Sequence, residues 1–302
     1  MNAFSVSTAV AAAIAAGRPV VSLETTLVTH GLPRPDGLQV AAELERIVVA
    51  HGALPATIGI LDGVVRVGMT SAELERLAEA PGVAKVNPST IAAVVAAGGC
   101  GSTTVAATLL AADRAGIRVF ATGGIGGVHR QAEMTGDVSA DLLALARHRV
   151  AVVTAGAKAV LDLPRTVELL DTLGVPVLGH GTDEFPAFYR RASGLRVDRR
   201  CDSIPEIAAT IRAHFEIGPP TGVVVANPIP PADEMPQDVY EAAVTAAVAA
   251  ADEAGIRGRD VTPFLLDRMR VATGGDSVVV NRALLANNAA VAADIAVALA
   301  GR

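Results

Sequence analysis

The sequence contains no tryptophan and only two cysteines, and aromatic residues make up 3% of its 302 positions. Cys100 and Cys201 are too few for a disulfide framework and form no CxxC spacing, so both are expected to be reduced thiols. The six histidines form no HExxH or HxH pair, which argues against a zinc site. No GxSxG motif is present, so serine hydrolase chemistry is not indicated either.

The sequence also lacks an excess of positive charge and a long apolar segment. Its 25 basic and 31 acidic residues give a net charge of −6, so we expect no nucleic acid polymer as a partner. The apolar stretch from Ala9 to Ala16 has no basic residue before it and is too short for a signal peptide or a membrane span. We therefore expect a soluble cytoplasmic protein that does not bind membranes.

Lysine is nearly absent as well. Two of the 25 basic residues, Lys85 and Lys158, are lysines, and the other 23 are arginines. Codon bias accounts for the depletion but not for the two lysines that remain. Arginine replaces lysine in most solvated roles, but it cannot lose its proton and act as an amine nucleophile. Both lysines are therefore candidates for chemistry, and an incidental position is the alternative for each.

Short apolar runs alternate with segments of helical periodicity, which predicts a layered α/β fold. The dipeptide Asp62-Gly63 between two apolar runs predicts a tight hairpin and hence a mixed sheet. No low-complexity linker or internal repeat is found, so we expect a single domain over residues 1–302. The predicted strands are 19–23, 56–61, 83–86, 118–121, 151–154, 175–178 and 222–226, and the predicted helices are 39–50, 71–80, 105–115, 139–147, 166–173, 239–254, 262–273 and 281–300.

Three ionisable side chains stand at the ends of predicted strands, where open α/β sheets bind their ligands. Glu24 follows the first predicted strand, Lys85 ends another, and Lys158 follows residues 151–154 through three small residues. A carboxyl group at the end of an apolar strand has a raised pKa unless it is paired, and it can then act as a general acid. A helix cap or a loop ion pair is the alternative for Glu24. The small neighbours of Lys158 are expected to desolvate its amine in part.

A glycine-rich loop and two helix starts supply further candidates. Four of the five residues from Gly123 to Gly127 are glycines, so backbone N–H groups can approach a small anion, assisted by Thr122, His129 and Arg130. The loop lacks a P-loop lysine, which favours a sugar phosphate over a nucleotide, and a merely flexible loop is the alternative. Thr104 opens a predicted helix at a position suited to phosphate or to simple capping. Asp137, near the next helix start, could hold a Mg²⁺ or Mn²⁺ ion through water, and the alternative is an ordinary helix-opening residue.

A series of motifs runs in order over nearly the whole chain. They are Leu23-Glu24-Thr25-Thr26, His30-Gly31, residues 55–59, residues 103–108, the glycine-rich loop, residues 139–142, Ala155-Gly156-Ala157-Lys158, residues 181–188, residues 226–230, residues 262–266 and Asn287-Asn288-Ala289. This series resembles the pseudouridine-5′-phosphate glycosidase family, also called indigoidine synthase A-like.

The resemblance implies a three-layer αβα domain with a mixed central β-sheet, assembled as a homotrimer. The implied reaction is the reversible cleavage of the C–C glycosidic bond of pseudouridine 5′-phosphate to uracil and ribose 5-phosphate, with one Mn²⁺ ion per subunit. By motif, Lys158 corresponds to the lysine that forms an imine with C1′ of the opened ribose, Glu24 to the proton donor, Lys85 to a second lysine at the substrate, and Asp137 to the metal ligand. The implied substrate and phosphate contacts are Thr104, Val105, Thr122, His129, Ser139, Ala140, Asp141 and one of Asn287 and Asn288.

The chemistry of a C-glycoside agrees with these residues. Such a bond has no heteroatom leaving group, so the ribose ring must open and C1′ must become an electron acceptor. An amine that forms an imine provides the acceptor, and a carboxylic acid provides the proton.

The chain departs from the family pattern after Lys85, where Val86-Asn87-Pro88-Ser89-Thr90 replaces an Arg-Arg-Asp type of segment. This difference keeps a second hypothesis open, another lysine-dependent sugar-phosphate lyase or aldolase on the same scaffold. A third hypothesis is a non-catalytic protein that binds sugar phosphates.

Overall fold

The computed structural model describes residues 3–31, 36–256 and 261–301. Within these ranges, eleven strands form one sheet in the order β1-β4-β3-β2-β7-β8-β11-β9-β10, with β6 beside β3 and β5 beside β6. β3 is antiparallel to β4 and β6, whereas the central strands β2, β7, β8 and β11 are parallel, so the predicted mixed sheet is confirmed. The strands are β1 (Phe4–Val6), β2 (Val20–Leu23), β3 (Leu54–Leu61), β4 (Val64–Val67), β5 (Ala84–Val86), β6 (Gly101–Thr103), β7 (Val119–Ala121), β8 (Ala151–Thr154), β9 (Val177–His180), β10 (Arg199–Cys201) and β11 (Val223–Ala226).

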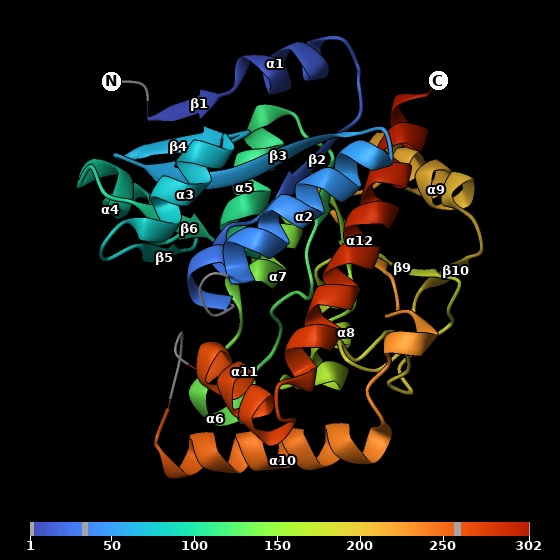
Figure 1. Cartoon of the computed structure of the whole chain (residues 1–302). Coiled ribbons are helices and arrows are strands. Elements are labelled where there is room, and N and C mark those ends of the chain that lie inside the picture. Colours follow the sequence, from blue (N-terminus) through green and yellow to red (C-terminus); the bar gives the residue numbers. More distant parts are fainter. Residues whose placement is uncertain (1–2, 32–35, 257–260, 302) are drawn as a thin grey trace.

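Helices cover both faces of the sheet, because successive residues of each central strand point to opposite faces. Val119 and Ala121 belong to one buried core with α2, α9, α10, α11 and α12, and Phe120 belongs to a second core with α1, α5, α7 and α8. The predicted three-layer αβα fold is therefore confirmed (Figure 1). The helices are α1 (Thr8–Ala15), η1 (Leu27–Gly31), α2 (Asp36–Ala50), α3 (Ser71–Glu79), α4 (Ile91–Ala96), α5 (Val105–Ala115), α6 (Ala132–Thr135), α7 (Ala140–Leu145), α8 (Leu163–Thr172), α9 (Ile204–Ile217), η2 (Pro231–Asp233), α10 (Gln237–Glu253), α11 (Val261–Ala272) and α12 (Asp276–Ala300).

Because the central strands are parallel and in register, their carboxyl ends lie along the same edge of the sheet. Leu23 of β2 pairs with Ala121 of β7, and Ala121 pairs with Val153 of β8. The residues that follow these strands, beginning with Glu24 and Thr122, therefore lie side by side at the carboxyl edge of the sheet.

The long helix α12 runs beside α2 and crosses the centre of the sheet (Figure 1). Among the described residues, it is the one helix long and apolar enough to cross a membrane, with a mean hydropathy of 1.7 over its most apolar window. Half of that window is nevertheless buried inside the fold, and Ala289, Ala292 and Ala293 are fully buried. This burial is that of a core helix packed on a sheet.

Candidate functional site

Glu24 and Thr122 form the centre of the site. The Thr122 hydroxyl donates a hydrogen bond of 2.6 Å to Glu24 Oε1. Burial raises the pKa of Glu24, and the negative charge of Asp141 adds to this, whereas Lys158, the Thr122 hydrogen bond and Lys85 act in the opposite direction. Because the net pKa is raised, the expected role of Glu24 as a proton donor is chemically available to it.

Lys158 is held against the glycine-rich loop by backbone pairing. Its N–H donates to the carbonyl of Ile125 at 3.1 Å, and the Ile125 N–H donates to the carbonyl of Gly156, also at 3.1 Å. Gly156 has a φ of +89°, and a Cβ there would lie 1.9 Å from the Pro186 carbonyl oxygen, so this tight turn requires glycine. The turn from β8 thereby places Lys158 and the loop side by side.

Lys85, Thr104 and Lys158 line both of two adjoining cavities. The first, which we call the reaction lobe, has a volume of about 90 Å³. Its lining includes Glu24, Thr26, His30, Lys85, Thr104, Val105, Thr122, Lys158, Phe188 and Asn281. The second, the polar lobe, has a volume of about 200 Å³ and is lined by Lys85, Asn87, Thr90, Thr104, Gly126, His129, Asp137, Val138, Ser139, Ala140, Asp141 and Lys158. Eleven of the thirteen residues expected at the site therefore line one continuous cleft.

The polar lobe carries groups that suit an anionic end of a ligand. Thr104 is the N-cap of α5 and accepts a bond of 3.4 Å from the N–H of Ala107, so the start of this helix faces the lobe. Two residues of the divergent segment, Asn87 and Thr90, also line it. The Asn87 side chain is fixed there because its Oδ1 accepts from the N–H groups of Ser89 and Thr90.

His129 and Asp137 adjoin each other at the far side of the polar lobe, with Nδ1 and Oδ2 3.9 Å apart. Burial lowers the pKa of His129, and the lysines at positions 158 and 85 add to this, whereas Asp137 opposes the shift. The imidazole is therefore neutral at pH 7 and can act as a metal ligand. Within the described part of the chain, no group of three or more His, Cys, Asp and Glu side chains is arranged to hold a metal.

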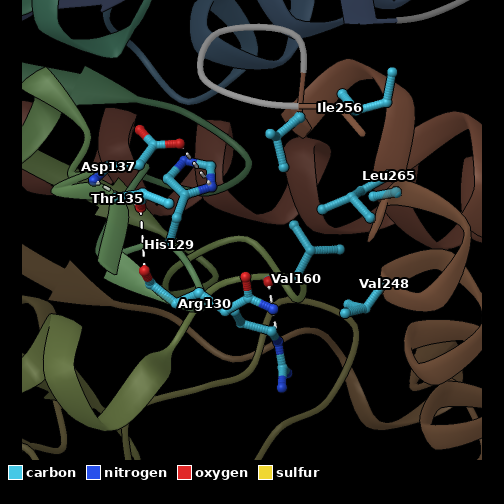
Figure 2. A pocket seen from close by; sticks show the side chains of 11 residues that line it. His129, Arg130, Thr135, Asp137, Val160, Val248, Ile256 and Leu265 are labelled. Atoms are coloured by element: carbon cyan, nitrogen blue, oxygen red, sulfur yellow. Dashed lines mark hydrogen bonds and ion pairs between the residues drawn. The ribbon is translucent and has the colours of Figure 1, made fainter. Parts of the chain in front are cut away.

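A larger cavity of about 460 Å³ lies beyond this pair. Figure 2 shows His129 and Asp137 at its polar end, opposite an apolar wall that includes Val160, Val248 and Leu265. Neither Glu24 nor Lys158 lines it. The Glu24 carboxyl group and the Lys158 amine are therefore in the smaller cleft.

The two remaining expected residues, Asn287 and Asn288, do not line either lobe, which corrects the expectation that one of them faces the sugar or base. The Asn287 amide donates to the Pro228 carbonyl at 3.1 Å. Asn288 is fully buried, donates to the Thr122 carbonyl at 2.8 Å and accepts from Asn227 at 2.9 Å. It therefore supports the loop beneath Glu24 from inside the core.

Asn281, which sequence reasoning missed, lines the reaction lobe instead. Asn281 and Asn288 are seven residues apart and share one face of α12, but Asn281 lies about 10 Å nearer the start of the helix. His30 is a second lining residue without a predicted role. Burial lowers its pKa, Lys85 lowers it further, and a backbone hydrogen bond with Val83 opposes both.

Comparisons with known proteins give one consistent result. Residues 9–298 match the family described as indigoidine synthase A like protein. The chain is 51% identical over 296 residues to the pseudouridine-5′-phosphate glycosidase of Sorangium cellulosum (98% of this chain, 93% of that protein). It is 50% identical over 297 residues to the enzyme of the same name from Geobacillus kaustophilus (98% of this chain, 99% of that protein).

Two solved structures are similar over nearly their whole length. The crystal structure of the prealnumycin C-glycosynthase AlnA in complex with ribulose 5-phosphate has a TM-score of 0.91 and 40% identity, and the match covers 98% of this chain and 97% of that chain. An indigoidine synthase A-like protein from Thermotoga maritima has a TM-score of 0.89 and 36% identity, with 99% of this chain and 97% of that chain covered.

Proposed function

Because this chain belongs to the indigoidine synthase A-like family, we propose that it is a pseudouridine-5′-phosphate glycosidase, an enzyme that reversibly cleaves pseudouridine 5′-phosphate to uracil and ribose 5-phosphate. The relatives at about 50% identity that carry this name support the proposal. So does the structural neighbour in complex with ribulose 5-phosphate, since that ligand is also a pentose phosphate.

One observation carries the proposal: Glu24 and Lys158 line the same reaction lobe, and Lys158 also lines the polar lobe. A sugar phosphate whose anionic end occupies the polar lobe would present its C1′ near the Lys158 amine. The base attached to C1′ would then lie in the reaction lobe with Glu24. The arrangement supports an electrophile made by the lysine and a proton supplied by the carboxyl group.

In the cleavage direction, the Lys158 Nζ bonds to C1′ as the C1′–O4′ bond breaks and the ribose ring opens. The nitrogen gives up one proton in this step, and O4′ takes up one proton as it becomes a hydroxyl group. The C1′–C5 bond to the base then breaks, its electron pair stays on C5 of uracil, and Glu24 gives C5 a proton. Water hydrolyses the imine that remains between Lys158 and C1′, which releases ribose 5-phosphate and the free amine. The synthesis direction follows the same steps in reverse, with the Glu24 carboxylate accepting the proton.

Other residues of the cleft bind and orient the substrate in this proposal. Lys85, Thr104, Ser139 and the first turn of α5 at Val105 take the phosphate and the sugar hydroxyls. The Asn281 amide offers both a donor and an acceptor, which suits the N–H and C=O groups on the edge of uracil. Leu285 and Phe188 line the same lobe and provide apolar contact for the base.

We propose that a Mn²⁺ ion binds at Asp137, with the neutral imidazole of His129 beside it. One carboxylate, water and substrate oxygens are a sufficient donor set for a hard divalent ion of this kind, so the residues fit it. When bound, the ion supplies positive charge beside the oxygens of the sugar phosphate.

Chelation is expected to abolish activity, and added Mn²⁺ is expected to restore it. Asp137→Asn is expected to raise the Mn²⁺ concentration needed for half-maximal activity by at least about tenfold, since an amide oxygen is a weaker ligand than a carboxylate. Metal titrations of both proteins check this. An unchanged titration in Asp137→Asn would place the ion elsewhere.

We also propose, from the family resemblance, that the chain acts in the cytoplasm as a homotrimer. Apolar side chains left exposed next to the site support contact with another chain. Met134, Val138 and Leu143, on and around α6 and α7, are 84%, 42% and 46% exposed.

The proposal is tested by incubating the protein with Mn²⁺, uracil and ribose 5-phosphate and separating the products by chromatography. Pseudouridine 5′-phosphate is the expected product.

Asn87 and Thr90 of the divergent segment line the polar lobe, and this observation favours a second candidate, a lysine-dependent lyase or aldolase for another sugar phosphate. A panel of sugar phosphates separates the two: turnover of another member without any pseudouridine 5′-phosphate would select the second. No turnover of any member by folded, metal-loaded protein would indicate a binding protein.

A further inference from the structure

Asp141 lies in the first turn of α7 with its side chain almost fully buried, at 5% relative exposure. Its Oδ1 accepts the N–H of Ala106 at 2.9 Å, and its Oδ2 accepts the N–H of Gly126 at 2.7 Å. A buried carboxylate is tolerated only when such bonds compensate its lost hydration. This one carboxylate therefore joins three segments: α7, the start of α5 and the glycine-rich loop.

The loop reaches Asp141 because residue 126 has no side chain. A Cβ on Gly126 would lie 2.2 Å from Ser139 Oγ and 2.8 Å from Asp141 Oδ2. Ser139 also holds Asp141 in place, since its hydroxyl accepts the Asp141 N–H at 3.2 Å. The contact between Gly126 and Asp141 therefore depends on both partners: the missing side chain at residue 126 and the carboxylate that Ser139 helps to hold.

Both reacting groups depend on the segment that Asp141 holds. The carbonyl of Ile125, directly before Gly126, accepts the N–H of Lys158. Thr122, at the start of the same loop, donates its hydroxyl hydrogen bond to Glu24. Both contacts of the Asp141 carboxylate are to backbone N–H groups, those of Ala106 and Gly126, although the residue also lines the polar lobe.

We propose that Asp141 is a positioning residue that ties the glycine-rich loop to α5 and so fixes Lys158 and Glu24 relative to each other, rather than the substrate contact expected from the sequence. The inference rests on the proposed function. The charge of Asp141 has a second effect, because it also raises the pKa of Glu24, against the lysines at positions 158 and 85 that face the same carboxyl group.

The test compares Asp141→Asn with the wild-type enzyme in the cleavage direction. The asparagine NH₂ group would face a backbone N–H and cannot accept its hydrogen bond. One of the two hydrogen bonds is therefore lost, while the side chain keeps its size. We expect kcat to fall by about 10- to 100-fold, as for other small misplacements of reacting groups. The alkaline limb of the pH profile is expected to move to lower pH, because burial still raises the pKa of Glu24 but the added contribution of the Asp141 charge is gone. The Kd for ribose 5-phosphate is expected to stay unchanged.

Two further variants keep the test decisive. Gly126→Ala pushes the glycine-rich loop away from Asp141 but leaves the negative charge of Asp141 in place. We therefore expect kcat to fall while the alkaline limb of the pH profile stays as in the wild type. If Asp141→Asn does not fold, this variant provides the test. Asp198→Asn is the matched control. Asp198 Oδ2 accepts the N–H of Val177, the first residue of β9, at 2.7 Å, and Asp198 lines neither lobe, so this variant should keep wild-type kinetics.

A weaker Kd for ribose 5-phosphate with unchanged kcat in Asp141→Asn would overturn the proposal and make Asp141 a substrate contact. Wild-type kcat in Gly126→Ala would overturn it as well. Failure of the proposed function is a separate result, visible as wild-type protein that makes no product and forms no imine with ribose 5-phosphate.

Discussion

Lys158→Arg is expected to leave a folded protein whose turnover is lower than that of the wild type by a factor on the order of 10⁴ or more, as when other covalent nucleophiles are removed. Arginine keeps the positive charge that the two lobes share, so sugar phosphate binding should survive. It cannot bond covalently to C1′, because the guanidinium does not lose its proton in proteins. The measurement is the initial rate of pseudouridine 5′-phosphate cleavage, together with ribose 5-phosphate binding by calorimetry.

Lys85→Arg is the informative companion, since Lys85 lines both lobes as Lys158 does. A cation at this position is enough to attract phosphate, so this variant should retain much of its kcat and show its main change in KM. Borohydride reduction in the presence of ribose 5-phosphate should add mass to the peptide that contains residue 158, in the wild type and in Lys85→Arg. A label on the peptide that contains residue 85, or substantial turnover by Lys158→Arg, would refute the covalent role of Lys158.

The layered fold could be predicted because the core strands and helices have strong periodic patterns. β8 and α5 begin and end at the predicted residues. The hairpin at Asp62-Gly63 is also confirmed, and both residues have the positive φ that its turn requires, 50° and 71°. The strands β1, β6 and β10 were not predicted, because their sequences, FSV, GST and RRC, do not form apolar runs.

The helix α9 was missed although its start has a clear signal. Ser203 caps it by accepting the N–H of Glu206, and Pro205 lies in its first turn, where a missing N–H costs nothing. The helix α1 is a different case: its sequence, TAVAAAIA, is apolar all round and so lacks the periodic pattern of a surface helix. Val10 and Ala13 are nevertheless buried against the sheet.

The residues that form the site could be predicted better than the directions in which their side chains point. Strand ends place Glu24 and Thr122 together whatever surrounds them, so sequence reasoning found both. Which asparagine of α12 reaches the cleft depends on where the helix crosses the sheet, and no local pattern encodes that crossing point. The two hydrogen bonds that Asp141 accepts from backbone N–H groups could not be predicted from the sequence either. Nothing in the sequence distinguishes a carboxylate that holds two segments together from one that contacts the substrate.

Glu24→Gln is expected to lower kcat for cleavage by about 10²- to 10⁴-fold, the usual contribution of a general acid. The amide keeps the shape of the carboxyl group and can still accept the Thr122 hydrogen bond through its oxygen, so binding of ribose 5-phosphate should be unchanged. It has no acidic proton to give to C5 of the base. Wild-type cleavage should also decline as the pH rises through the raised pKa of Glu24, because only the protonated carboxyl group donates.

Glu45→Gln provides the matched control for this prediction. Glu45 on α2 accepts a hydrogen bond from a threonine hydroxyl, that of Thr57, and burial raises its pKa as well. The same chemical change is thus made in the same kind of pair, but outside the cleft, so activity and its pH profile should stay as in the wild type. If Glu24→Gln kept its rate, or kept the alkaline decline of the wild type, the proton would have to come from another group. The imidazolium form of His30 would be the next proton donor to test, since His30 lines the same lobe.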